Sequence, residues 1–120
     1  RFGHEAGDMA LRHFASVLSQ RLRTTDLLCR LGGEEFAALL PNTSAAQAAA
    51  IAEALREHLA SSPMMVDGTP LQMTLSAGVA TFGQDGERLD QLMNAADKRT
   101  YAAKRAGRNQ VVSAEASVPA

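Results

Sequence analysis

The segment RLGGEEFAALLP, residues Arg30–Pro41, sets two glycines and two carboxylates between short apolar runs. The run DLLCRL ends just before the glycines, and FAALLP begins just after the acids. This pattern predicts a β-hairpin whose tip is Gly32-Gly33-Glu34-Glu35. Glycines permit positive φ angles and carry no side chain, so a ligand can approach the backbone closely. A solvated turn with two surface acids would explain the same four residues without any ligand.

The adjacent acids Glu34 and Glu35 suit a metal site. Neighbouring residues of a strand point to opposite faces, so the two carboxylates need not crowd each other. One can face a metal ion while the other lies at the rim. Oxygen ligands suit Mg²⁺, which proteins commonly bind through one or two carboxylates together with substrate phosphates.

Helical periodicity occurs on both sides of the hairpin. A first helix is expected from about Asp8 to Arg23, and Asp8 suits its N-terminus because an acid there faces the positive end of the helix dipole. A second helix is expected after Asn42-Thr43-Ser44, which offer capping side chains. The apolar positions that define the two helices are Leu11, Phe14, Ala15, Leu18 and Leu22, then Ala48, Ile51, Ala52, Leu55 and Leu59.

The remaining segments complete an α+β pattern. Strands are expected around an Asp67-Gly68 turn, with clean alternation from Met73 to Thr81. A third helix is expected over residues 87–107, ended by Gly107 as a left-handed cap, and a last strand over residues 109–112. The order α-β-β-α-β-α-β predicts a ferredoxin-like sheet flanked by helices, with the leading central strand missing.

Length and composition limit the number of domains and the classes of ligand that the chain can have. The 120 residues predict one compact domain over residues 1–112, followed by a disordered tail over residues 113–120. The net charge of −1 lacks the basic excess of a nucleic-acid binder, so an anionic ligand needs a local cluster of cations. The single cysteine, Cys29, excludes an intrachain disulfide. No window has a membrane-spanning apolar length, so direct membrane contact is not expected.

Four separate motifs, in the same order, resemble the GGDEF family, the diguanylate cyclases, in its GGEEF variant. They are FGHEAGD at residues 2–8, RLGGEEF at 30–36, LSAGVATF at 75–82 and ADKRTYAAKRAGRNQVV at 96–112. The resemblance implies a nucleotidyl-cyclase-like fold and a bacterial signalling transferase. In such enzymes two GTP molecules, each on its own domain of a homodimer, are joined into cyclic di-GMP with Mg²⁺ or Mn²⁺.

The resemblance also implies roles for individual residues. Gly32 and Gly33 let the nucleotide approach the hairpin, Glu35 binds the metal, and Glu34 helps the ribose 3′-hydroxyl to react. Asp8 matches the acid that reads the guanine edge; a helix cap is the alternative role, and the two roles are compatible. Lys104 and Arg108 match residues that hold the terminal phosphates. By themselves, these two and Arg105 also fit a solvated basic patch that complements a helix C-terminus.

The segment RTTD, residues Arg23–Asp26, lies five residues before Gly32 and resembles the family's RxxD inhibitory site. Cyclic di-GMP bound there would give product feedback, because Arg binds phosphate or guanine edges and Asp accepts guanine N–H groups. An arginine at a helix C-terminus needs no ligand to explain it. Some family members add a second arginine, at the position aligned with Ala54. Arg56 is the nearby substitute.

Two functions follow from the resemblance. The first is a diguanylate cyclase in the parent protein, with this 120-residue portion inactive alone, because the family's first metal-binding Asp and a guanine-reading Asn precede FGHEAGD. The second is a catalytically inactive GGDEF-like module that binds GTP or cyclic di-GMP as a sensor. Either would be cytoplasmic, with any membrane tether in an upstream domain.

Overall fold

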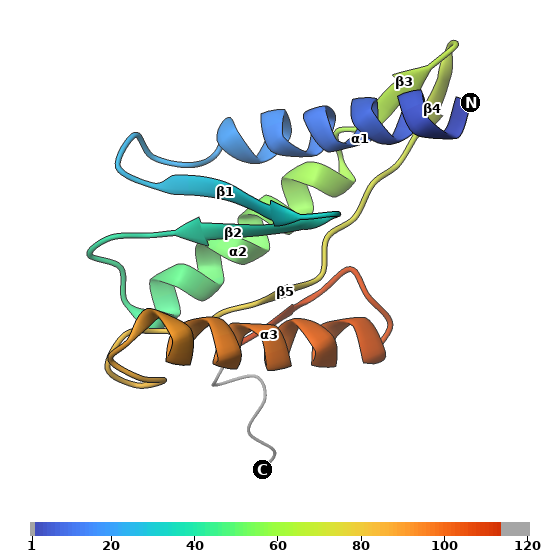
Figure 1. The fold of residues 1–120 in the computed structure, drawn as a ribbon. Coiled ribbons are helices and arrows are strands. Elements are labelled where there is room, and N and C mark those ends of the chain that lie inside the picture. Colours follow the sequence, from blue (N-terminus) through green and yellow to red (C-terminus); the bar gives the residue numbers. More distant parts are fainter. Residues whose placement is uncertain (1, 114–120) are drawn as a thin grey trace. The chain divides into compact units, whose positions relative to one another are not determined.

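A computed structural model describes residues 2–113 of the chain, and their helices and strands give an α+β fold (Figure 1). The α+β class predicted from the sequence is therefore confirmed. The helices are α1 (Phe2–Ser19), α2 (Ala45–Ala60) and α3 (Leu89–Arg105). The strands are β1 (Leu27–Gly32), β2 (Glu35–Leu39), β3 (Met64–Val66), β4 (Thr69–Leu71), β5 (Ala77–Gly78) and β6 (Val111–Val112).

The chain forms two compact units. The first comprises residues up to 42 together with 58–73, and the second comprises residues 43–57 together with those from 74 onward. Most of the expected tail, residues 114–120, lies outside the described residues. Ser113, the first residue of that expected tail, is buried.

In the first unit, β1 and β2 form the predicted hairpin. They pair antiparallel from Leu27 opposite Leu39 to Gly32 opposite Glu35. The register shifts between Arg30 and Gly32, so β1 carries one extra residue there. A β-bulge of this kind bends a strand and increases its twist. The bulge therefore lies directly beside the tip that holds the two acids.

Helix α1 differs from its predicted limits of Asp8 and Arg23, since it begins at Phe2 and ends at Ser19. No proline interrupts residues 2–8, so the backbone can extend the helix in front of Asp8. The prediction of Asp8 as an N-terminal cap is therefore wrong. At the other end, the backbone N–H of Arg23 donates to Asp26 Oδ2 at 2.8 Å. This bond closes a turn over residues 23–26, between the end of α1 and the start of β1.

The segment between α2 and α3 contains the strands expected around the Asp67-Gly68 turn and a third, short strand. Strands β3 and β4 form a hairpin around Asp67 and Gly68, whose φ angles of 51° and 81° suit a type I′ turn. That predicted turn is confirmed. The long strand expected from Met73 to Thr81 is reduced to β5, because its ladder partner β6 pairs over two residues only. Three short strands thus replace the single strand of the predicted order.

In the second unit, β5 pairs in parallel with β6, and α3 packs against both strands. A Cβ atom on Gly78 would fall 2.5 Å from the Thr100 backbone nitrogen and closer still to the Ala96 carbonyl oxygen. Only glycine therefore allows α3 to lie this close to the strand. Arg99 fixes the same junction, because its Nη1 donates to the Val79 carbonyl oxygen at 2.7 Å.

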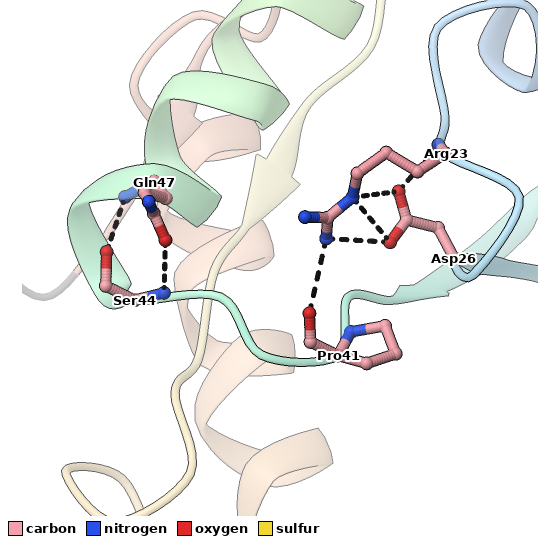
Figure 2. A network of polar contacts seen from close by, with 5 residues as sticks. All are labelled: Arg23, Asp26, Pro41, Ser44 and Gln47. Atoms are coloured by element: carbon pink, nitrogen blue, oxygen red, sulfur yellow. Dashed lines mark hydrogen bonds and ion pairs between the residues drawn. The ribbon is translucent and has the colours of Figure 1, made fainter.

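Capping groups define helix ends in the second unit. Ser44 and Gln47 form a reciprocal capping box at the start of α2, with bonds of 3.0 and 3.1 Å (Figure 2). At the end of α3, Gly107 has a φ of 121°, as expected for a left-handed cap. The Arg108 N–H donates to the Ala103 carbonyl oxygen at 2.9 Å. This is the hydrogen bond of a Schellman motif that spans six residues.

The described strands form three separate two-stranded sheets. The ferredoxin-like arrangement needs a further strand between β2 and β5, and the described residues contain none that pairs with either edge. In this part of the chain, no helix is long and apolar enough to cross a membrane. The buried apolar side chains are Val17, Leu18, Leu59 and Met64 in the first unit, and Ala48, Leu55 and Ala103 in the second.

Candidate functional site

The hairpin tip presents the two predicted acids to solvent. Glu34 lies in the turn and Glu35 begins β2, and both are exposed. Within residues 2–113, neither carboxylate accepts a hydrogen bond or joins an ion pair. Gly32 and Gly33 have φ angles of 149° and 51°, a backbone that other L-residues adopt only with strain. The tip therefore combines an accessible backbone with two carboxylates that no cation among residues 2–113 neutralises.

The side chain of Arg30 contacts this tip, which the sequence reasoning missed. Its Nε and Nη2 donate to the Gly33 carbonyl oxygen at 3.0 and 2.7 Å. The signal in the sequence is an arginine three residues before a glycine, whose side chain can reach forward across the turn. The pattern is too short to separate it from a solvated strand arginine.

The strand behind the tip is held by an aromatic contact. The rings of Phe14 in α1 and Phe36 in β2 lie 4.9 Å apart between centroids and are tilted by 39°. Tilted aromatic pairs at this separation are favourable. Because Phe36 directly follows Glu35, this contact connects the base of the acidic tip to α1.

Asp8 belongs to the same unit as the hairpin and lies on α1 with an exposed side chain. In the described residues no hydrogen bond or ion pair engages its carboxylate. Its exposure is compatible with a role as a ligand-facing acid. The structure gives no contact that joins Asp8 to the tip.

Lys104 and Arg108 belong to the second unit, at the C-terminal end of α3. Both are exposed, and neither side chain pairs with another described residue. Arg108 follows the Gly107 cap and has a positive φ of 64°, so it lies outside the helix. Arg105 differs, since its guanidinium donates to the Tyr101 hydroxyl at 3.3 Å and lies 5.7 Å from that ring.

Arg23 and Asp26 form an ion pair in the first unit (Figure 2). Nη2 of Arg23 donates to Oδ1 of Asp26 at 2.8 Å, and Nε donates to both carboxylate oxygens at 3.1 Å. The Arg23 Nη2 also donates to the Pro41 carbonyl oxygen at 3.4 Å. The hydrogen bond from Arg23 lowers the pKa of Asp26, so this carboxylate is ionised at neutral pH.

Arg56, the nearby substitute for a second inhibitory arginine, is already engaged within the second unit. It forms a short ion pair with Glu53, and its Nη1 donates to Asn109 Oδ1 at 3.1 Å. The hydrogen bond to Glu53 raises the pKa of Arg56. A ligand would have to replace these contacts in order to use Arg56.

The residues present fit a divalent cation only as a partial site. Among residues 2–113, no group of three or more His, Cys, Asp or Glu side chains could hold a metal ion. Mg²⁺, however, keeps several waters and needs only one or two carboxylates beside substrate phosphates. The carboxylate of Glu35, which is exposed and has no partner within residues 2–113, meets that smaller requirement.

Comparisons with known proteins agree with the motifs. The sequence profile described as "Diguanylate cyclase, GGDEF domain" matches residues 1–110. Over 113 residues the chain is 43% identical to the response regulator PleD of Caulobacter vibrioides; this covers 92% of the chain but 25% of PleD. The chain thus spans about a quarter of that relative's length.

Two solved structures are also similar. The GGDEF domain of YfiN from Pseudomonas aeruginosa superposes with a TM-score of 0.88 and 35% identity, covering 94% of this chain and 71% of that one. The GGDEF domain of DgcB from Caulobacter crescentus, solved in complex with c-di-GMP, gives a TM-score of 0.79 and 32% identity. That match covers 94% of this chain and 67% of that one.

Proposed function

Since the chain belongs to the GGDEF diguanylate cyclase family, we propose that the full-length protein condenses two GTP molecules into cyclic di-GMP. The observation that carries this proposal is the hairpin tip. Gly32 and Gly33 leave the backbone accessible, and Glu34 and Glu35 are exposed without a neutralising partner in the described structure. A degenerate, sensor-type tip would not need to keep two unpaired acids together.

Glu35 is proposed to bind Mg²⁺ or Mn²⁺ with the help of the substrate phosphates. When bound, the metal would supply charge stabilisation at the reacting phosphate. Glu34 is proposed to accept a hydrogen bond from the ribose 3′-hydroxyl. Gly33 allows the nucleotide to lie against the turn, because no Cβ atom projects there and the space around it is open.

Three further residues are proposed to bind GTP. Lys104 and Arg108 are exposed cations without an acidic partner in the described region, so a triphosphate can recruit both. Asp8 offers a carboxylate acceptor, which suits the N–H donors on the Watson–Crick edge of guanine. Each domain of a homodimer would hold one GTP, so that the two substrates react across the dimer.

Feedback is the second part of the proposal. The Arg23–Asp26 pair is proposed to bind cyclic di-GMP, which would inhibit its own synthesis. The pair supports this by combining an exposed guanidinium with an ionised carboxylate. The c-di-GMP complex of the similar DgcB domain makes the same ligand a reasonable choice. Inhibition is proposed to use this pair without a second arginine, because Ala54 stands where some family members place that arginine.

The test compares Glu35→Gln with Glu87→Gln in the full-length protein, using GTP, Mg²⁺ and product analysis. Glu87 is a matched control because it is also exposed and its side chain has no partner in the described residues. Synthesis should disappear in Glu35→Gln and remain in the control. Wild-type turnover by Glu35→Gln would contradict the assigned role.

A further inference from the structure

Arg30 makes an unusual contact for an arginine beside two carboxylates. Two donors of its planar guanidinium converge on one acceptor, the Gly33 carbonyl oxygen, at 3.0 and 2.7 Å. Its side chain forms no ion pair with Glu34 or Glu35. The guanidinium therefore restrains the backbone of the tip and does not neutralise either acid.

The tip depends on such a restraint because its own sequence is permissive. Two consecutive glycines lose more conformational entropy on ordering than other residues would. The bulge between Arg30 and Gly32 also interrupts the regular ladder. In the described part of the chain, the two hydrogen bonds from Arg30 are the only side-chain hydrogen bonds to residues 32–35.

We infer that Arg30 is a positioning residue for the reaction, acting through Gly33. This inference rests on the proposed function, because it concerns how the tip presents Glu34, Glu35 and the Gly33 backbone to GTP and the metal. When Arg30 holds the Gly33 carbonyl group, the backbone that follows it has a defined direction, and this direction sets where Glu34 and Glu35 lie. A misplacement of about 1 Å in such a site costs about 100-fold in rate.

The kinetic constants distinguish a positioning role of Arg30 from direct binding of the substrate. A residue that only orients the tip should change turnover much more than the KM for GTP. An arginine that bound the triphosphate itself should raise the KM instead. Lysine can give one donor to the same carbonyl oxygen but not the planar pair, so Arg30→Lys should lie between wild type and Arg30→Ala.

The experiment measures kcat and KM for GTP in full-length Arg30→Ala and Arg30→Lys, with Arg21→Ala as a control. Arg21 is another exposed arginine of the same unit, without a side-chain partner in the described residues. We expect kcat to fall by about 10- to 100-fold in Arg30→Ala, with KM within about threefold and partial recovery in Arg30→Lys. Unchanged kcat, or a rise in KM alone, would overturn the inference.

Hydrogen exchange of the amides of residues 32–35 gives a second readout that needs no activity. Faster exchange in Arg30→Ala than in Arg21→Ala is expected, because the restraint on the tip is removed. Equal exchange in both variants would overturn the restraint. If the wild type makes no cyclic di-GMP, the proposed function fails, while the exchange result still decides whether Arg30 orders the tip.

Discussion

Arg23 and Asp26 are joined by three side-chain hydrogen bonds of 2.8 to 3.1 Å, which leave only 1% of the Asp26 side chain exposed. A ligand that binds this pair must therefore replace hydrogen bonds that the two side chains already make to each other. We predict that Arg23→Ala weakens cyclic di-GMP binding by about tenfold or more, since a hydrogen bond to a charged group is lost. Titration calorimetry on wild type and variant measures this.

The same variant should relieve product inhibition while basal turnover is retained. Arg21→Ala is the control, because it removes a nearby exposed arginine from outside the pair. Equal affinities for cyclic di-GMP in wild type and Arg23→Ala would remove the pair from the proposed inhibitory site.

Lys104 and Arg105 are neighbours with different surroundings, which gives a matched pair of variants. The amine of Lys104 has no partner in the described residues, whereas Arg105 contacts the Tyr101 hydroxyl and ring. We predict that Lys104→Ala raises the KM for GTP by about tenfold, because a charged contact to phosphate is lost. Arg105→Ala should leave KM near the wild-type value. The reverse order would assign the phosphate contact to Arg105.

Gly78 and Gly7 give a test of the packing between β5 and α3. Alanine at Gly78 would collide with the backbone of α3, and we predict a loss of about 1–3 kcal/mol in the free energy of unfolding. Gly7 lies in α1 with nothing within 4 Å of an added Cβ, so Gly7→Ala should stabilise by up to about 1 kcal/mol. Urea denaturation of both variants measures the difference. A neutral Gly78→Ala would contradict the close approach.

The Asp85–Arg99 ion pair predicts a dependence of stability on pH. Arg99 donates to both oxygens of Asp85 at 2.8 and 3.0 Å, and this lowers the pKa of the Asp85 carboxyl. Because an unfolded aspartate titrates near about 3.9, the ionised pair stabilises the fold above about pH 4. That contribution is lost as the pH falls through the lower folded pKa.

Asp85→Asn should therefore cost about 1–3 kcal/mol at pH 7, and this cost should shrink as the pH falls through the lowered folded pKa of Asp85, below which both proteins carry a neutral group. Asp67→Asn is the control, because Asp67 lies in an exposed turn and asparagine also accepts its positive φ. Denaturation midpoints at pH 7 and at a series of lower acidic pH values provide the comparison. A penalty for Asp85→Asn that does not change with pH would contradict the role of the ion pair.

The sequence predicted those features that local chemistry determines. The hairpin at Gly32–Glu35, the Asp67-Gly68 turn and the Gly107 cap were all found because glycine and turn residues have narrow backbone requirements. The start of α1 was missed, since an acid such as Asp8 suits a helix N-terminus but is also tolerated inside a helix.

Features that depend on tertiary contacts could not be predicted. The strand over residues 73–81 alternates well, but a ladder needs a partner, and β6 supplies one only at Ala77 and Gly78. The contact of Arg30 with Gly33 depends on the bulge, which no residue pattern specified. The roles of Asp8, Glu34, Glu35, Lys104 and Arg108 stay predictions that rest on the family motifs.

The most direct test of the central claim is product identification by mass spectrometry after the full-length protein is incubated with GTP and Mg²⁺, with and without EDTA. The account predicts that cyclic di-GMP accumulates with Mg²⁺ and does not form once the metal is chelated. If GTP or cyclic di-GMP binds but no cyclic di-GMP is made under either condition, the result contradicts the account and identifies a binding module.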